Sequence, residues 1–309
     1  MNKTIVISSF GDEFFRKWKY YKRKFSKKNF SKKGIKDWFI CSDYCVDDDN
    51  KNDVITFTII PTIFMKQVYS DSKRYLTKDL KHISSISSEV INYLKNNEEC
   101  FSISIILTNK KLFVNNLSEM SKHLHAQIDD YKTMPDDLKN QKKSEYKRIV
   151  DFVSYIDSKN CDRKFMSHFF MVLHTVAYIM EFLIIKENAN LVNWVSDRDS
   201  IISFKDGIIY DLLNALVYSL IKNRSKDYKI GLFHFNELQN FDPILRIPDI
   251  ITGALSSIAI NKNGVVCTQK KKHKVIIEDV IYNNPRIFIN YFIWHKIYGH
   301  QEFVLFNHP

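Results

Sequence analysis

The sequence predicts an α/β protein in which a mixed β-sheet carries helices on its faces. The first observation is the stretch WFICSDYCVDDDNKNDVITFTIIP at residues 38–61, where two apolar runs flank a polar turn and predict a β-hairpin. The second is the order of the later segments, because strand-like runs alternate with helical runs between residues 189 and 260. No internal repeat or low-complexity linker interrupts this order, so the sequence gives no clear domain boundary.

The spacing of apolar residues predicts each element. In chain order, we expect a strand at 4–10, a basic helix at about 14–33, the hairpin at 38–61, a helix at 71–97, a strand at 100–109, a helical region at 116–186, a strand at 189–197, a helix at 206–223, a strand at 228–235 and a helix at 246–260. The segment 129–148 is polar and contains Pro135, which predicts a loop or an exposed inserted helix.

These elements suggest three parts of the chain. Residues 1–37 form an N-terminal strand and basic helix, and residues 38–260 form a core with a helical insertion at about 112–186. Residues 261–309 are expected as a C-terminal extension packed on the core.

The composition excludes several classes of protein. With 45% hydrophobic and 26% charged residues, the chain resembles a globular protein rather than a disordered one. It has only 7 glycines and neither GxGxxG nor GxxxxGK[ST], so no nucleotide-binding loop is predicted. The five cysteines form no CxxC pair, which indicates reduced thiols and a cytoplasmic protein. The apolar run at 169–185 is shorter than the roughly 20 residues of a membrane span and contains His174 and Glu181, so we expect a buried helix and no membrane span.

The positive charge is concentrated in one segment. The formal net charge is +11, and residues 14–33 hold ten basic residues and no acid, which leaves the rest of the chain at +1. The spacing of Phe14, Trp18, Tyr21 and Phe25 places these rings on one helical face. One interpretation is a helix docked by its aromatic stripe with a solvated basic face. Another is contact with the phosphates of a nucleic acid, and an acidic protein partner or a membrane surface is a third.

Under the nucleic-acid interpretation, eight side chains of this segment would contact the phosphate backbone. They are Arg16, Lys17, Lys19, Lys22, Arg23, Lys24, Lys27 and Lys28.

Three acids lie in or beside apolar elements. Asp43 is inside the first run of the hairpin, where neither a cap nor a turn explains a carboxylate that is costly to bury. Asp197 ends the strand LVNWVSD, and Asp249 follows Pro248 in the expected first turn of a helix, where the helix dipole is an alternative explanation. Sites of open α/β sheets form at strand ends and nearby helix starts. Converging carboxylates favour a divalent cation, so these acids are candidate ligands of Mg²⁺ or Mn²⁺.

The arrangement resembles the ribonuclease H-like superfamily, with one acid in the first strand of a hairpin, one ending a later strand and one on a helix. More narrowly, SDYCVDD with ITFTIIP, WVSDRDS and IPDIITGAL resemble the motifs of the prokaryotic "domain of unknown function 3800" group. Tyr44 stands where that group usually has an acid, and Pro248 where it usually has an alanine. For a further acid of a ribonuclease H-type site, the resemblance suggests Glu119, with Glu89 as an alternative.

The resemblance implies a metal-dependent nuclease in which a metal-activated water attacks a phosphodiester. The acids would be Asp43, Asp197, Asp249 and Glu119, the cofactor Mg²⁺ or Mn²⁺, and the partner DNA or RNA gripped by the basic segment. The setting would be a bacterial antiviral defence or mobile-element system. The alternative is a catalytically inactive module of the same fold that binds nucleic acid or protein, and a protein partner or a homo-oligomer stays open under both.

Overall fold

The computed structural model describes residues 8–27, 34–46, 48, 50–107, 117–133, 136, 143–197, 200–221, 227–233, 240–260, 266–282, 284–295 and 299–305. The chain divides into two compact units. The first comprises residues 1–110, 182–197 and 226–309, and the second comprises residues 111–181 and 198–225.

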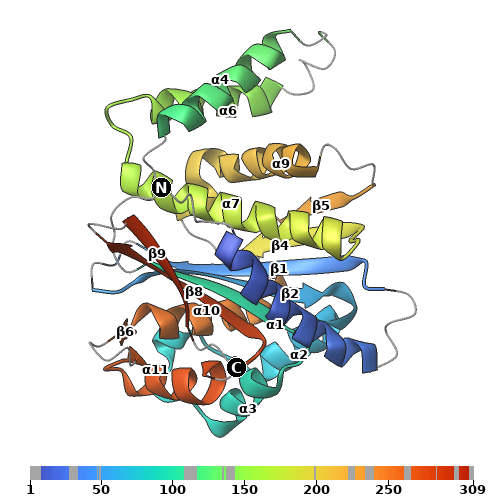
Figure 1. Cartoon of the computed structure of the whole chain (residues 1–309), viewed down its shortest axis with the longest axis vertical. Helices are drawn as coiled ribbons and strands as arrows, with labels where there is room; N and C mark the ends of the chain where they lie inside the picture. Colours follow the sequence, from blue (N-terminus) through green and yellow to red (C-terminus); the bar gives the residue numbers. More distant parts are fainter. Residues whose placement is uncertain are drawn as a thin grey trace. The chain divides into compact units, whose positions relative to one another are not determined.

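The first unit is built on a mixed sheet (Figure 1). Its described strands are β1 (Asp37–Cys45), β2 (Asp53–Pro61), β3 (Phe101–Leu107), β4 (Leu191–Ser196), β5 (Lys229–Leu232), β8 (Ile287–His295) and β9 (Gly299–Leu305). Their order across the sheet is β5-β4-β1-β2-β3-β8-β9. β2 is antiparallel to β1 and β3, β4 is parallel to β1 and β5, β8 is parallel to β3, and β9 is antiparallel to β8. The predicted mixed α/β sheet is therefore confirmed.

The predicted hairpin is the centre of this sheet. β1 and β2 pair from Trp38 opposite Pro61 to Cys45 opposite Val54. All nine residues of β2 are buried, as expected for a strand covered on both faces.

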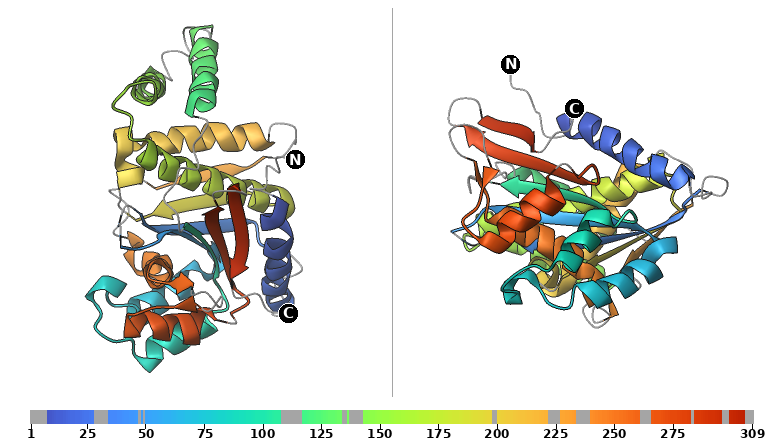
Figure 2. Two further views of the ribbon diagram at one scale, coloured as in Figure 1. Left: turned by 60° about the vertical axis from the view of Figure 1, so that its left-hand side comes forward. Right: turned by 90° about the horizontal axis from the view of Figure 1, so that it is seen from below.

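Helices cover both faces of the sheet in the first unit. They are α1 (Ser8–Lys27), η2 (Thr62–Phe64), α2 (Met65–Tyr75), η3 (Leu80–His82), α3 (Ser88–Asn96), α10 (Asp242–Ser256), α11 (Lys271–Val275) and the π-helical turn η6 (Ile276–Ile281). Figure 2 shows α1 on one side of the sheet and α2, α3, α10 and α11 on the other. A short ribbon of β6 (Ala259–Ile260) and β7 (Val266–Cys267) follows α10.

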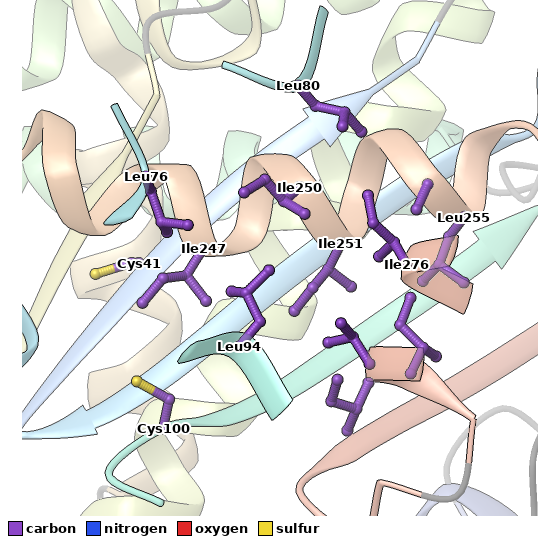
Figure 3. Close-up of a cluster of buried hydrophobic side chains, with 14 of the residues drawn as sticks. Cys41, Leu76, Leu80, Leu94, Cys100, Ile247, Ile250, Ile251, Leu255 and Ile276 are labelled. Atoms are coloured by element: carbon purple, nitrogen blue, oxygen red, sulfur yellow. The ribbon is translucent and has the colours of Figure 1, made fainter. Parts of the chain in front are cut away.

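The face under α10 carries an aliphatic core (Figure 3). Ile247, Ile250 and Ile251 of α10 are each at most 3% exposed and pack with Cys41 of β1. Burying each such side chain stabilises the fold by about 1.5–3 kcal/mol. Leu80 approaches α10 so closely that a Cβ on Gly253 would lie 2.7 Å from its Cδ2 atom, so glycine makes room for this contact.

Several predicted boundaries were wrong. Residues 8–10 begin α1 and do not belong to a strand, while the rest of the expected 4–10 strand lies outside the described residues. The helix expected at 71–97 is two helices, α2 and α3, with η3 between them. α10 begins at Asp242, with Pro243 in its first turn, so Pro248 lies inside the helix. The segment after residue 261 contributes β8 and β9 to the main sheet and is more than an extension packed on the core.

The second unit is helical where it is described. It contains α4 (Leu117–Lys132), α6 (Lys143–Ile156), α7 (Arg163–Lys186) up to Glu181, α8 (Ser200–Ser203), η4 (Phe204–Gly207) and α9 (Ile208–Ile221). The rings of Phe152, Phe169 and Phe204 pack together, and Arg148 of α6 forms two hydrogen bonds with Asp211 of α9.

α7 coincides with the apolar run of the sequence. Among the described helices it is the one long and apolar enough to cross a membrane, and 61% of its most apolar window is buried inside the protein. The core helix of a globular protein passes the same test, so this helix is weak evidence for a span.

Candidate functional site

Adjacent parallel strands bring Asp43 and Asp197 together. β1 and β4 pair in register up to Ser42 opposite Ser196, and Asp43 and Asp197 are the residues that follow. The backbone N–H of Asp197 donates to the carbonyl oxygen of Ser42 at 3.0 Å, which extends the pairing to this point. Asp43 is 8% exposed, whereas Asp197 lies on the surface.

The alternation of side chains along β1 directs Asp43 toward α10. Phe39 and Cys41, two and four residues before it, belong to the aliphatic core on that face. Above the strand, the Thr252 hydroxyl of α10 lies 3.4 Å from the carbonyl oxygen of Asp43 and donates to it. Asp43 therefore sits between the sheet and α10.

Asp43 is part of a polar row across three strands. It pairs with Thr56 of β2, which pairs with Ser104 of β3. The hydroxyls of Thr56 and Ser104 are hydrogen-bonded at 2.9 Å, and both residues are buried. Burying polar groups is costly unless they are paired, so this row provides a polar setting for the Asp43 carboxylate.

Asp249 lies well inside α10 and not in its first turn. The first turn holds Asp242 instead, so the helix dipole does not explain Asp249. Its Oδ2 atom accepts a hydrogen bond from the backbone N–H of Leu80 at 2.9 Å. Arg246, one turn earlier, donates to the carbonyl oxygen of Leu76 through Nη1 at 2.5 Å. Asp249 thus holds the first residue of η3 against α10.

Two neighbouring carboxylates act on Asp249. Burial raises its pKa above the usual range, and the negative charges of Asp79 and Asp197 raise it further, while the Leu80 hydrogen bond and Lys81 oppose the shift. The charge of Asp197 therefore reaches Asp249, which connects the end of β4 with α10. Asp79 is an acid that the sequence reasoning missed, because it lies in a polar loop next to η3 where nothing distinguishes it from a solvated residue.

Tyr44 faces away from Asp43, on the α1 side of the sheet. Its hydroxyl lies 2.6 Å from the Ser42 hydroxyl and accepts from the Ser196 hydroxyl at 3.0 Å. The indole N–H of Trp194 donates to the Ser42 hydroxyl at 2.9 Å. The tyrosine that stands where the resembled group has an acid therefore removes no carboxylate from the face that carries Asp43.

The two candidates for a further acid differ in how far they can be described. Glu119 lies in α4 of the second unit, and its side chain is outside the described residues. Glu89 lies in the first turn of α3, where its own backbone N–H and the Ser87 hydroxyl lower its pKa. That environment is typical of a helix N-terminus and accounts for Glu89 without a site.

The predicted aromatic stripe of α1 is confirmed. Phe14, Trp18 and Tyr21 are at most 4% exposed. The Trp18 ring lies 5.5 Å from that of Trp38 on β1 and 5.2 Å from that of Phe101 on β3. The side chain of Phe25 is outside the described residues. Because Trp38 alternates with Phe39, α1 covers the face of the sheet opposite to α10.

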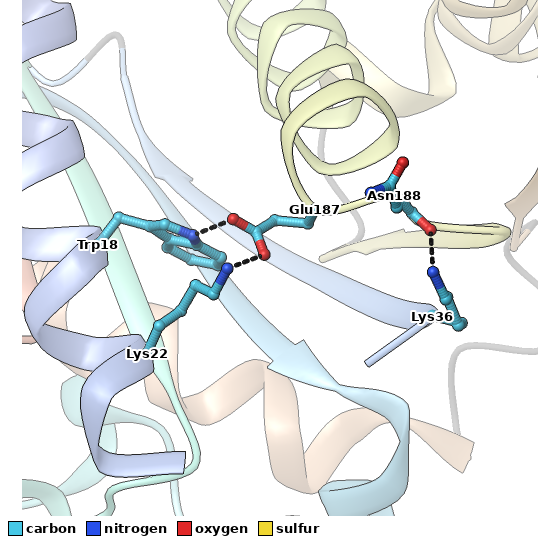
Figure 4. Close-up of polar contacts among 5 residues, drawn as sticks. All are labelled: Trp18, Lys22, Lys36, Glu187 and Asn188. Carbon is cyan, nitrogen blue, oxygen red and sulfur yellow. Dashed lines mark hydrogen bonds and ion pairs between the residues drawn. The ribbon is translucent and has the colours of Figure 1, made fainter. Parts of the chain in front are cut away.

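Polar contacts at the end of α7 hold α1 in place (Figure 4). The indole N–H of Trp18 donates to Oε1 of Glu187 at 2.9 Å, and Lys22 Nζ donates to Oε2 at 2.5 Å. Lys36 Nζ donates to the carbonyl oxygen of Asn188 at 3.4 Å. The bond to Glu187 occupies Lys22, one of the lysines that the sequence suggested for nucleic-acid contact.

The remaining basic residues of α1 have different surroundings. Lys17 is 4% exposed and donates through Nζ to the carbonyl oxygen of Ile287, so it serves the docking of the helix. Arg16, Lys19 and Arg23 are exposed on the side opposite the aromatic stripe. The side chains of Lys24 and Lys27 and the whole of Lys28 lie outside the described residues.

Asp43, Asp197 and Asp249 suit Mg²⁺ or Mn²⁺ by donor type, since all offer carboxylate oxygens. As placed, however, they are not a ready site: where the structure describes the chain, no three His, Cys, Asp or Glu side chains are grouped so that they could hold a metal ion. One oxygen of Asp249 is already bound to Leu80, which leaves Oδ1 for another ligand. The donors fit the ion, and their spacing would have to tighten around it.

Comparison of the chain with protein-family models, with curated proteins and with solved structures finds no match in any of the three.

Proposed function

We propose that this chain is a Mg²⁺- or Mn²⁺-dependent nuclease with a ribonuclease H-like sheet. The observation that carries the proposal is the placement of the acids: one in the first strand of the hairpin, one at the end of the neighbouring strand β4, and one on the helix that covers β1. This is the distribution that the resemblance implied. A reducing, cytoplasmic setting in a bacterial defence or mobile-element system belongs to the same proposal, and Cys41, Cys45, Cys100 and Cys161 are free thiols.

In this proposal Asp43, Asp197 and Asp249 would hold the ion. A bound divalent ion supplies charge for the phosphodiester oxygens and activates water. The chain contributes the rigid part of the site, since Asp43 is fixed by β1 and by Thr252 above it. It also contributes the repulsion between Asp197 and Asp249, which a cation would relieve.

The test compares the wild type with Asp43→Asn and Asp249→Asn. Mn²⁺ binding is followed by the loss of the free-ion electron paramagnetic resonance signal, and cleavage by labelled single- and double-stranded DNA and RNA. We expect weaker Mn²⁺ binding and cleavage reduced by about a hundredfold or more, because even partners outside the coordination shell contribute 10- to 100-fold. Asp249→Asn keeps an oxygen that can accept from Leu80, so it separates the charge from the structural bond.

Asp151→Asn is the matched control, because Asp151 is an exposed carboxylate of α6 in the second unit. Glu119→Gln and Glu89→Gln identify the further acid, since only the one that belongs to the site should reduce cleavage. Equal Mn²⁺ binding and equal cleavage in the wild type and both aspartate variants would contradict the nuclease.

The second candidate is an inactive nucleic-acid- or protein-binding module of the same fold. The specific observation in its favour is that Asp249 is bonded to Leu80 while no metal-holding group is assembled among the described residues. A wild type that binds nucleic acid, takes up no Mn²⁺ and cleaves nothing would establish this alternative.

A further inference from the structure

A second basic surface lies at the C-terminal end of α10. The Ser257 hydroxyl, directly after α10, lies 2.6 Å from Nδ1 of His273 in α11. The backbone N–H of Asn52, at the β1–β2 turn, donates to the carbonyl oxygen of Ser256 at 2.9 Å. The end of α10 therefore joins the β1–β2 turn, where Lys51 pairs with Asp48 at 2.5 Å, to the lysine-rich run KKKHK at 270–274.

One residue connects this surface with the candidate site. Lys272 Nζ donates to the carbonyl oxygens of Leu80 and Ile83, both at 2.7 Å. The backbone N–H of the same Leu80 donates to Asp249. A single residue, Leu80, thus lies between a candidate metal ligand and the lysine-rich segment.

We define the lysine rim as five lysines around η3 and the end of α10: Lys51, Lys81, Lys270, Lys271 and Lys274. Lys270 and Lys271 are exposed. The other three have carboxylate partners within the protein, since Lys51 pairs with Asp48, Lys81 with Asp79 and Lys274 with Glu278. Lys81 is 73% exposed in its side chain. Lys51, Lys270 and Lys272 also act together on His273, whose pKa they help to lower, so their charges converge on one place at the end of α10.

We propose that the lysine rim is the surface that binds the phosphate backbone next to the acids. A strand whose phosphodiester reaches Asp197 and Asp249 would continue over the rim on the α10 face of the sheet. The exposed side of α1 belongs to the opposite face, so it does not hold the same stretch of the strand. This inference rests on the proposed function for its ligand, a nucleic acid.

The physical reason is that the candidate acids and the lysine rim lie next to each other on the same face. Lysine ammonium groups act as mobile point charges for phosphates, and each phosphate they neutralise releases counterions. Acids without such a rim would repel the polyanion that they are to act upon. Lys81, whose charge reaches Asp249, offsets that repulsion where the strand would enter.

Two matched double variants test the inference. Lys270→Gln/Lys271→Gln alters the rim, and Lys19→Gln/Arg23→Gln alters α1; all four residues are exposed, and each variant removes two positive charges from the formal +11. Binding of fluorescein-labelled single-stranded and duplex oligonucleotides is measured by anisotropy in EDTA, between about 50 and 200 mM salt. For duplex DNA we expect the rim variant to lower the slope of log K against log salt by about 2, at about 0.9 for each lost phosphate contact. The α1 variant should keep the wild-type slope.

Three outcomes would overturn the rim: equal losses in both variants, a loss only in the α1 variant, or no salt-dependent binding by the wild type. The last outcome would indicate instead that both basic surfaces bind an acidic protein partner. The test is independent of cleavage, since EDTA removes the metal. A wild type that binds with the expected pattern but never cleaves contradicts the nuclease alone, and a wild type that cleaves while the rim variant binds normally contradicts the rim alone.

Discussion

The two faces of the central sheet are covered in different ways. On one face α1 inserts Phe14, Trp18 and Tyr21 against aromatic rings of the strands, and even Lys17 is used for docking. On the other, α10 covers an aliphatic core that is interrupted by a polar row containing Asp43 and Thr56. The α1 face is organised for stability, whereas the α10 face carries groups that packing alone does not require. The described part of α1 and the acids Asp43 and Asp249 thus lie on opposite faces of the sheet.

The largest effect is expected on the α1 face. Trp18→Ala should lower the free energy of unfolding by about 3–5 kcal/mol, as for other buried aromatic truncations, because Trp18 is 2% exposed and its indole N–H bonds Glu187. Urea unfolding followed by circular dichroism measures this. Tyr20→Ala is the control on the same helix, because Tyr20 is 45% exposed, and its substitution should change stability by less than about 1 kcal/mol. Equal stability of both variants would show that α1 is not docked by its rings.

Much of this contrast between the two faces of the sheet could be predicted from local sequence patterns. The spacing of Phe14, Trp18 and Tyr21 predicts a docked stripe, and the alternation in β1 places Asp43 in a strand. The sheet that α1 covers and the side it covers depend on where Trp38 points and on pairing with β4, about 150 residues further along the chain. Periodicity shows which residues share a face, but a distant partner decides what covers that face.

The candidate site was less predictable for the same reason. Pro248 indicated a helix start, because proline is favoured in the first turn and costly inside a helix. In the structure the helix begins at Asp242, where Pro243 takes the first-turn role. That shift changes the explanation of Asp249 from a dipole effect to a hydrogen bond with Leu80, which is far away in sequence. Neither this bond nor the proximity of Asp79 has a local signal.

An intermediate effect is expected on the α10 face, where two substitutions of Asp249 separate its bond from its charge. Asp249→Ala leaves the Leu80 N–H without its acceptor and should cost about 1–3 kcal/mol. Asp249→Asn retains an acceptor oxygen and removes a carboxylate whose pKa is raised by burial and by its neighbours, so it should be as stable as the wild type or more stable at neutral pH. Thermal and urea unfolding in EDTA provide the comparison. Equal destabilisation by both substitutions would show that the charge itself holds η3 to α10.

The smallest effect concerns the end of α10, where His273 reports on the lysine rim. Burial, followed by the charges of Lys270, Lys272 and Lys51, lowers the His273 pKa to about 4. The unfolded chain, with an ordinary histidine, therefore binds more protons than the folded chain between these two pKa values, and stability must fall as the pH falls through this window. The contribution of neutral His273 to the free energy of unfolding is complete above about pH 6.5 and is lost toward pH 4.

From about pH 7 to about pH 5, His273 should account for on the order of 1 kcal/mol of lost stability. His273→Asn should remove this part of the pH dependence. Urea unfolding at several pH values measures the difference. In Lys270→Gln/Lys271→Gln, fewer cations face the imidazole, so its pKa should move back toward the ordinary value and the slope should become shallower. An unchanged slope in that variant would mean that Lys270 does not contribute to the lowered pKa of His273.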